Sequence, residues 1–148
     1  MTYQVKNDTV KIDSRPRIAS IIAAAVHEAY DTLVEGLDRV YNRSLSYAQY
    51  CLDYWPKHDT FCALRNAAAG FERTSELADQ AGDALSELAR ISNDCAYWYL
   101  KMNEDDTQNY REEYEASAAK VNEARAKVRE SIAALKAIRS DVVELDYL

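Results

Sequence analysis

One stretch of the sequence carries acidic residues at a spacing that could hold a metal ion. Glu28, Asp31, Glu35 and Asp38 recur every three or four positions, next to His27. On a helix this spacing places carboxylates on one face, where they can bind Mg²⁺ or build a two-metal centre. The sequence lacks the Glu-x-x-His pairs that di-iron bundles require, and such acidic spacing is common on charged helical faces. These residues therefore predict a solvated helix surface rather than a metal site.

Two short motifs give an enzymatic interpretation its most concrete form. Helical nucleotide pyrophosphohydrolases use paired Glu-x-x-Glu and Glu-x-x-Asp segments, and Glu112-x-x-Glu115 and Glu28-x-x-Asp31 have similar spacings. The glycines are too scattered to build a phosphate-binding loop. We expect His58 in a loop, as a capping or surface residue, rather than beside a catalytic nucleophile. We therefore expect no catalytic residues, no metal and no cofactor, and we retain a metal-dependent helical nucleotide hydrolase as the second alternative.

The densest group of aromatic and acidic residues surrounds a turn at 103–107. Its members are Tyr97, Trp98, Tyr99, Glu104, Asp105, Asp106, Tyr110 and Tyr114. Three successive aromatic residues on a helix point in three directions, so at least one must be exposed or must face another element. Exposed aromatic side chains often anchor interfaces, and surrounding carboxylates favour a basic partner. We predict a partner-binding surface here; the alternative is that the first helix or the N-terminal arm covers these aromatic residues.

A second aromatic group precedes the middle of the chain. It consists of Tyr41, Tyr47, Tyr50, Tyr54 and Trp55. These side chains could form a stacking or ligand pocket. They could also close the opposite end of a helical bundle, with the tyrosine hydroxyl groups reaching water. The sequence leaves both interpretations open.

Composition limits the fold class. The 148 residues include only two Pro and three Gly, whereas an all-β fold needs a turn about every 8–12 residues. Apolar residues make up 48% and charged residues 29% of the chain, a balance typical of globular proteins and not of disordered ones. A few long helices remain as the expected architecture.

Charge and cysteine content limit the partners and the compartment. The net charge is -7, and the whole acidic excess lies in residues 75–148. A nucleic-acid binder or a protein of anionic membranes ordinarily needs a basic face, so we expect neither direct nucleic-acid binding nor membrane binding. Cys51, Cys62 and Cys95 form no Cys-x-x-Cys motif, and their odd number suggests reduced thiols in a cytoplasmic protein.

Helical periodicity covers nearly all of the chain. We predict one helix from residue 14 to about residue 43, with apolar residues at steps of three and four. A short helix should follow within 44–58 and end at Pro56. Another helix is predicted from residue 59 to about residue 103, with a kink or break near 70–75 because the apolar register slips there.

The most regular pattern follows the turn. Apolar or small residues alternate at steps of four and three from Tyr110 to Leu145, which is typical of a coiled-coil seam. The helices on both sides of the turn should form an antiparallel hairpin in which an acidic flank faces a basic flank. We predict an all-α fold, an elongated three-helix bundle built on this hairpin, with a short extra helix. Residues 1–13 are expected to form an arm or small β-hairpin, and residues 14–148 a single helical-bundle domain.

These features favour a non-enzymatic protein–protein interaction module, since no motif is specific enough to indicate a known family. The expected partner is another protein, with basic character, that binds through helical surfaces and the acidic aromatic turn. The small residues in the seam leave room for further helices, so we also expect a homodimer. The first alternative is an acidic inhibitor that occupies a basic cleft on a nucleic-acid enzyme, because residues 76–115 carry a net charge of -8, with eleven acidic and three basic residues.

Overall fold

The computed structural model describes residues 2–5, 8–11, 15–43, 45–105 and 107–143. Two strands, β1 (Thr2–Val5) and β2 (Asp8–Lys11), pair antiparallel and precede four helices. The helices are α1 (Ile18–Tyr41), α2 (Tyr47–Ala67), α3 (Glu72–Glu104) and α4 (Gln108–Lys136). The all-α prediction is confirmed by these four helices.

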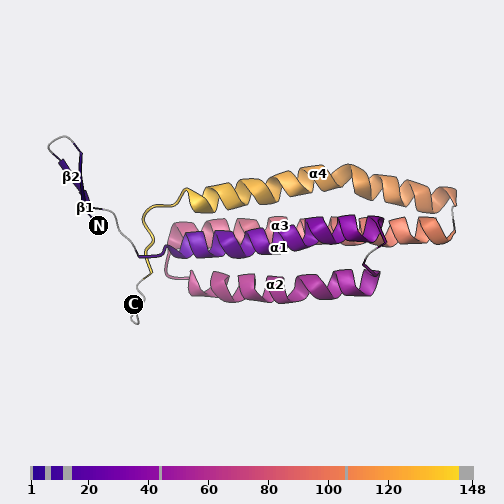
Figure 1. The fold of residues 1–148 in the computed structure, drawn as a ribbon, viewed down its shortest axis with the longest axis horizontal. Coiled ribbons are helices and arrows are strands. Elements are labelled where there is room, and N and C mark those ends of the chain that lie inside the picture. The colour runs from indigo at the N-terminus through magenta and orange to yellow at the C-terminus, as the bar shows by residue number, and fades with distance from the viewer. Residues whose placement is uncertain (1, 6–7, 12–14, 44, 106, 144–148) are drawn as a thin grey trace.

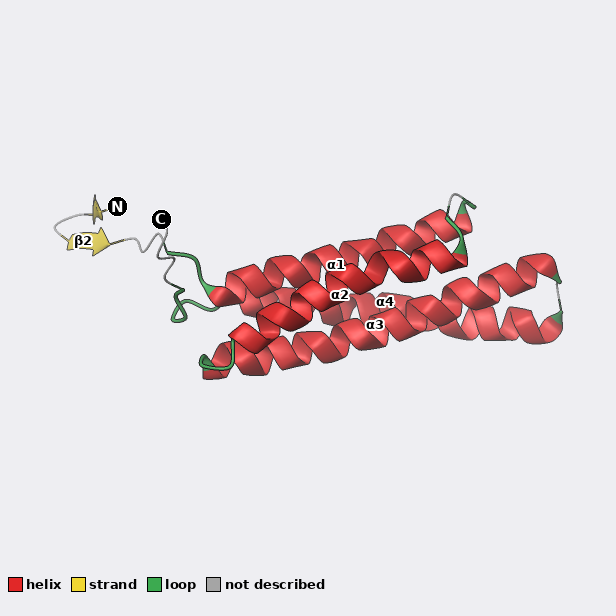
Figure 2. Cartoon of the chain, turned by 90° about the horizontal axis from the view of Figure 1, so that it is seen from below, coloured by secondary structure: helices red, strands yellow, loops and turns green. Residues whose placement is uncertain are grey.

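The helices lie side by side along one long axis (Figure 1). α3 and α4 pack on each other along most of their length, and α1 packs against all three other helices. α2 rests mainly on α1 and touches α3 much less. At one end the α3–α4 hairpin extends past the ends of α1 and α2, as both views show (Figures 1 and 2).

The core runs along α1 and the facing sides of α3 and α4. Its fully buried side chains include Ile22, Val26, Leu37, Val40, Leu85, Leu88, Val128 and Leu135. The seam residues of the last helix are buried within the chain itself: Val121, Ala124, Val128, Ile132 and Leu135. The seam therefore serves intramolecular packing.

The prediction for α2 was wrong in length. Pro56 does not end a short helix but lies inside α2, which continues to Ala67. A proline lacks the N–H that would bond the carbonyl four residues earlier, and this loss is tolerated here because Pro56 is exposed to water. Buried side chains on either side of it, Tyr54 and Phe61, hold the helix against the bundle. Tertiary packing therefore outweighs the local breaker, and the extra helix is not short.

The helical structure is interrupted between α2 and α3, next to the region 70–75 where the sequence predicted a kink or break. Ala68 is the C-cap of α2, and Phe71, with extended backbone, is the N-cap of α3. The amide of Phe71 donates to the carbonyl of Ala68 at 2.9 Å, which closes a tight turn. The exposed Gly70 sits in this turn. The break therefore lies at the edge of the predicted region 70–75, and residues 59–67 continue α2 instead of beginning the next helix.

The last helix is shorter than the seam predicts. α4 ends at Lys136, and the following segment turns back to the start of α1 instead of continuing to Leu145, which lies outside the described residues. Asp141 is buried there, and its Oδ2 accepts from the Ala19 amide at 2.8 Å and from the Thr74 hydroxyl at 2.6 Å. The N-cap residue of α1, Arg17, makes no capping hydrogen bond with its side chain. Asp141 therefore supplies the cap from the far end of the sequence and joins α1 to α3.

No helix in the described ranges combines the length and the apolar character needed to cross a bilayer.

Candidate functional site

The exposed end of the α3–α4 hairpin carries the aromatic and acidic residues that the sequence singled out. We call residues 97–114 the hairpin end. The turn is fixed by Thr107, the N-cap of α4, whose side chain accepts a hydrogen bond from the Tyr110 amide at 3.2 Å. α1 and α2 stop short of this end, and the N-terminal strands lie at the opposite end of the molecule (Figure 1). The turn itself therefore lies beyond α1 and α2, whereas the end of α1 still contacts two of the aromatic residues, Tyr99 and Tyr114.

Two of the predicted site residues belong to the packing of the bundle. Tyr99 and Tyr114 are half-buried, and both rings contact Tyr41 at the end of α1, at centroid distances of 4.7 and 6.3 Å. The Tyr99 hydroxyl donates to the Tyr41 carbonyl oxygen at 3.1 Å. The Tyr41 hydroxyl lies 2.8 Å from Cys95 Sγ, and burial raises the pKa of Tyr41 far above its ordinary value, with the Cys95 contact adding to the rise. These tyrosines join the hairpin to α1.

Three other aromatic residues, Tyr97, Trp98 and Tyr110, contact one another in a row at the hairpin end. Trp98 and Tyr110 face each other across the hairpin, with ring centroids 5.8 Å apart, and both are half-buried. Tyr97 is 38% exposed, and its ring contacts Trp98 on one side and Tyr47 of α2 on the other. The Lys101 ammonium lies 5.7 Å from the centre of the Tyr97 ring, a cation–π distance. These three side chains form the aromatic part of a possible contact surface.

Acidic residues lie close to these aromatic residues in the sequence of both helices. Glu104 and Asp105 are exposed at the end of α3, whereas Asp106 lies outside the described residues. Glu112, Glu113 and Glu115 are exposed on the first turns of α4. Glu104 lies 3.9 Å from Lys101, so part of the charge is compensated locally.

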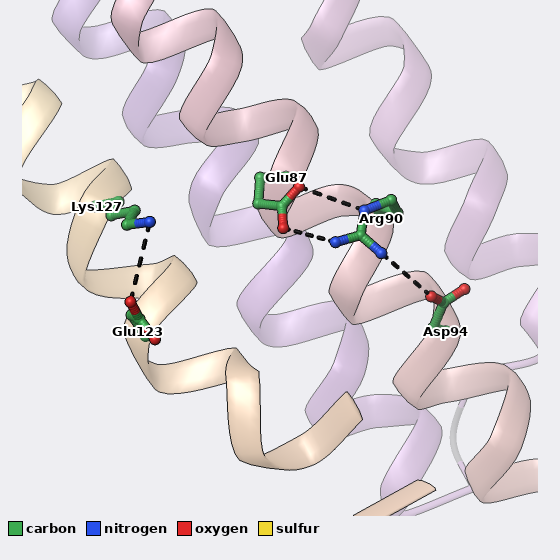
Figure 3. A network of polar contacts seen from close by, with 5 residues as sticks. All are labelled: Glu87, Arg90, Asp94, Glu123 and Lys127. Atoms are coloured by element: carbon green, nitrogen blue, oxygen red, sulfur yellow. Dashed lines mark hydrogen bonds and ion pairs between the residues drawn. The ribbon is translucent and has the colours of Figure 1, made fainter. Parts of the chain in front are cut away.

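Further along the hairpin, three acidic residues are paired with basic residues of their own helices (Figure 3). Arg90 lies between Glu87, at 2.6 Å, and Asp94, at 3.8 Å, while Lys127 of α4 contacts Glu123 at 4.0 Å. The hydrogen bond from Arg90 lowers the pKa of Glu87, and Lys127 acts in the same direction from α4. Basic residues of α4 thus act on Glu87 of α3 through their charge. The ion pairs in Figure 3, however, each join two residues of the same helix.

The second aromatic group divides between two places. Tyr41 belongs to the hairpin contacts, while the other members lie along α2. Three of them, Tyr50, Tyr54 and Trp55, line a cavity of about 330 Å³ between α2 and α3. We call this cavity the α2–α3 pocket; its lining residues are Leu33, Tyr50, Cys51, Tyr54, Trp55, His58, Ser86, Ala89, Arg90 and Asn93. Tyr50 and Tyr54 are buried, whereas Trp55 is 56% exposed at the rim. The sequence missed the contribution of α3, although Ser86, Ala89, Arg90 and Asn93 recur at helical spacing.

His58 was predicted in a loop and instead lies on α2. Its ring nitrogen Nδ1 is 3.7 Å from Cys62 Sγ, one turn further along the helix. Its ring also contacts Tyr54 and Trp55, at centroid distances of 5.7 and 5.5 Å. His58 therefore belongs to the aromatic wall of the α2–α3 pocket, and it lies there because α2 continues past Pro56.

The acidic motifs considered for metal binding are not brought together. Glu28 precedes Tyr41 by 13 residues on α1, or about 20 Å at 1.5 Å per residue, and the Tyr41 ring contacts Tyr114, which lies between Glu112 and Glu115. Glu28 instead contacts Lys57 of α2 at 3.5 Å. Among the described residues, no group of three or more His, Cys, Asp and Glu side chains is arranged to hold a metal ion.

Comparison of the chain with protein-family models, with curated proteins and with solved structures finds no match.

Proposed function

We propose that this chain is a non-enzymatic protein-interaction module and that a partner protein binds the hairpin end. The observation that carries the proposal is the partial exposure of Tyr97, Trp98 and Tyr110 on a hairpin that extends past α1 and α2 (Figure 2). Large aromatic side chains at an interface commonly supply much of its binding energy, and they do so best when surrounding groups exclude water. The paired rings of Trp98 and Tyr110 give a partner a preformed apolar surface to cover.

The charge of the hairpin end supports a basic partner. Both helices carry exposed acidic residues close in sequence to these aromatic residues: Glu104, Asp105, Glu112, Glu113 and Glu115. Lys101 and Arg111 are the cations between residues 97 and 115. Electrostatic complementarity mainly raises the rate and specificity of association, so binding should weaken as salt screens the charges.

An acidic inhibitor that occupies a basic cleft of a nucleic-acid enzyme is the second candidate. It is supported by the net charge of -8 over residues 76–115. Part of this charge is compensated by Arg90, which contacts both Glu87 and Asp94, and part by Lys101, which contacts Glu104. A mimic of nucleic acid should lose its target steeply with salt and should be displaced by DNA or RNA, whereas a general basic partner should be displaced by neither.

The cysteines and the expected homodimer complete the proposal. The three cysteines are free, as expected of a protein in a reducing compartment such as the cytoplasm. The homodimer expected from the sequence stays a prediction, and because the seam of α4 is buried inside the chain, a dimer would have to form through another surface.

Charge reversal at the hairpin end tests the proposal. The variant Glu112→Lys/Glu113→Lys/Glu115→Lys should lose the protein that the wild-type chain captures from source cells. The matched control Asp83→Lys/Glu123→Lys/Glu130→Lys changes the same number of exposed carboxylates further along the hairpin and should retain capture. Equal capture by both variants, measured by quantitative mass spectrometry, would argue against binding at the hairpin end.

A further inference from the structure

The α2–α3 pocket is open to solvent at its rim and is closed at two ends, where the antiparallel helices touch. At one end, the Tyr47 hydroxyl donates to Asn93 Oδ1 at 2.9 Å. At the other end, Gly82 lets Phe61 approach so closely that a Cβ on Gly82 would lie 3.3 Å from the Phe61 ring. Between these contacts the helices leave about 330 Å³, within the range of pockets that hold small molecules, which begins at about 300 Å³.

One wall of the pocket is aromatic. The rings of Tyr54, Trp55 and His58 contact one another, with centroid distances between 5.5 and 5.9 Å. Trp55 is one of the few large apolar side chains of the described residues that are exposed, and it stands at the rim. A flat aromatic molecule can stack on such a wall in offset or edge-to-face geometry.

Asn93 supplies the polar group that orients a ligand. Its Oδ1 already accepts from the Tyr47 hydroxyl at 2.9 Å and from Cys51 Sγ at 3.4 Å. These two contacts direct the oxygen toward α2, and the Asn93 NH₂ group donates no hydrogen bond within the described chain. Because Asn93 lines the pocket, its amide offers donors to a bound molecule.

The buried tyrosines add a second polar feature. Tyr50 and Tyr54 are 3% and 6% exposed, and both line the pocket. Tyr50 has Ser92 as a hydrogen-bonding neighbour, whereas the Tyr54 hydroxyl makes no hydrogen bond among the described residues. A buried hydroxyl without a partner is unfavourable, and such groups in native structures call for an explanation. A bound acceptor that reaches the Tyr54 hydroxyl would relieve this cost.

Charge in the pocket disfavours a strongly anionic ligand. Arg90 lines the pocket, but its guanidinium is engaged by Glu87 and Asp94 (Figure 3). The remaining polar lining comes from neutral side chains and His58. The recognition chemistry is therefore stacking plus hydrogen-bond donation.

We propose that the α2–α3 pocket binds an uncharged, flat aromatic molecule with a hydrogen-bond acceptor, which stacks on the Tyr54–Trp55–His58 wall and accepts from the Asn93 amide. This site is independent of the hairpin end, and the proposal does not rest on the proposed function.

A matched pair of probes tests the proposal. Quinoline and naphthalene have the same shape, and only quinoline carries a ring nitrogen that accepts a hydrogen bond. Titrations of the full ¹⁵N-labelled chain at pH 7.5 should shift the Trp55 indole N–H and the Asn93 amide signals with both probes. The variant Asn93→Asp keeps an acceptor for Tyr47 and Cys51 but removes the donor. It should weaken quinoline binding about fivefold, the effect of one neutral hydrogen bond, and leave naphthalene within about twofold.

A blocking variant keeps the test decisive if Asn93→Asp does not fold. Ser86→Trp places a large side chain at the pocket from an exposed position on α3, and Ala133→Trp does the same at an exposed position on α4. Ser86→Trp should abolish the shifts from both probes, and Ala133→Trp should preserve them, with circular dichroism confirming the fold of each. Absence of binding to the wild-type chain, unchanged binding to Ser86→Trp, or equal losses of quinoline and naphthalene in Asn93→Asp would overturn the proposal.

Discussion

Replacing Asp141 should destabilise the bundle more than any other change outside the apolar core. Its carboxylate is 4% exposed and accepts from two buried groups, the Ala19 amide at 2.8 Å and the Thr74 hydroxyl at 2.6 Å. In Asp141→Ala both donors lose their partner, and Thr74 is itself only 1% exposed. A hydrogen bond to a charged group contributes about 1.5–3 kcal/mol, so we expect Asp141→Ala to lower the free energy of unfolding by about 3 kcal/mol.

Conservative variants separate the parts of this effect. Asp141→Asn keeps one acceptor oxygen, and its NH₂ group can occupy the place of Oδ1, which makes no hydrogen bond in the described part of the chain. It should therefore cost about 1 kcal/mol. Thr74→Val removes one hydrogen bond to the charged carboxylate and should cost about 1.5–3 kcal/mol. The neighbouring Ser140 is exposed, so Ser140→Ala should stay within about 0.5 kcal/mol of the wild type.

Urea denaturation followed by circular dichroism measures these differences. The double variant Asp141→Ala/Thr74→Val should lose less than the sum of the two single losses, because the two residues share one hydrogen bond. A loss below about 0.5 kcal/mol in Asp141→Ala would refute the capping role. Strict additivity of the two substitutions would refute the hydrogen bond between Asp141 and Thr74.

Three further predictions concern packing, ionisation and association. Gly36→Ala should lower the free energy of unfolding by about 1–3 kcal/mol, because the new Cβ would lie 2.8 Å from the buried Tyr50 ring of α2. A Cβ at Gly70 meets no atom within 4 Å, so Gly70→Ala should be neutral or stabilising. Thermal melts of both variants measure the difference. Burial raises the pKa of Tyr54 from 10.0 to about 12. The stabilising contribution of the neutral hydroxyl is therefore complete below pH 10 and is lost as the pH rises toward 12. Denaturation curves between pH 10 and pH 12 should show a smaller loss of stability in Tyr54→Phe than in the wild type. Sedimentation at high micromolar concentration should show a dimer that Leu52→Ser/Trp55→Ser dissociates, since these side chains are 63% and 56% exposed, and a wild-type monomer would contradict the dimer prediction.

The sequence predicted those features that repeat along a helix. Alternate steps of four and three place Val121, Ala124 and Val128 on one face, and that face is buried. The turn at 103–107 and the helices on both sides of it follow from the same periodicity. Periodic burial is a local property, so a single sequence reveals it.

Features that depend on distant residues could not be predicted in this way. Pro56 is a local helix breaker, yet burial of Tyr54 and Phe61 carries α2 through it. Asp141 caps a helix that begins 123 residues earlier, and nothing near either segment indicates the pairing. The α2–α3 pocket likewise arises from the pairing of Tyr47 with Asn93, whose side chains meet only after the helices have packed.

The directions of the aromatic side chains at the hairpin end could be predicted only in part. Three adjacent aromatic residues must point in different directions, which correctly implied that they could not all be buried in one seam. Tyr99 packs inward against Tyr41, Trp98 faces Tyr110, and Tyr97 is exposed. The sequence could not assign these directions, because they depend on where α1 and α2 end relative to the hairpin.

The most direct test of the proposed interaction surface separates binding from stability. Trp98→Ala/Tyr110→Ala removes the half-buried pair at the hairpin end, where few core contacts are lost. Leu88→Ala removes a fully buried side chain from the middle of α3 and should cost about 2–5 kcal/mol. Both variants and the wild-type chain are compared by thermal melts and by affinity capture from source cells with quantitative mass spectrometry. The proposal predicts that the hairpin variant melts well above Leu88→Ala and fails to capture the protein that the wild type binds. A hairpin variant that captures that protein at the wild-type level, or that melts as low as Leu88→Ala, would contradict the proposal.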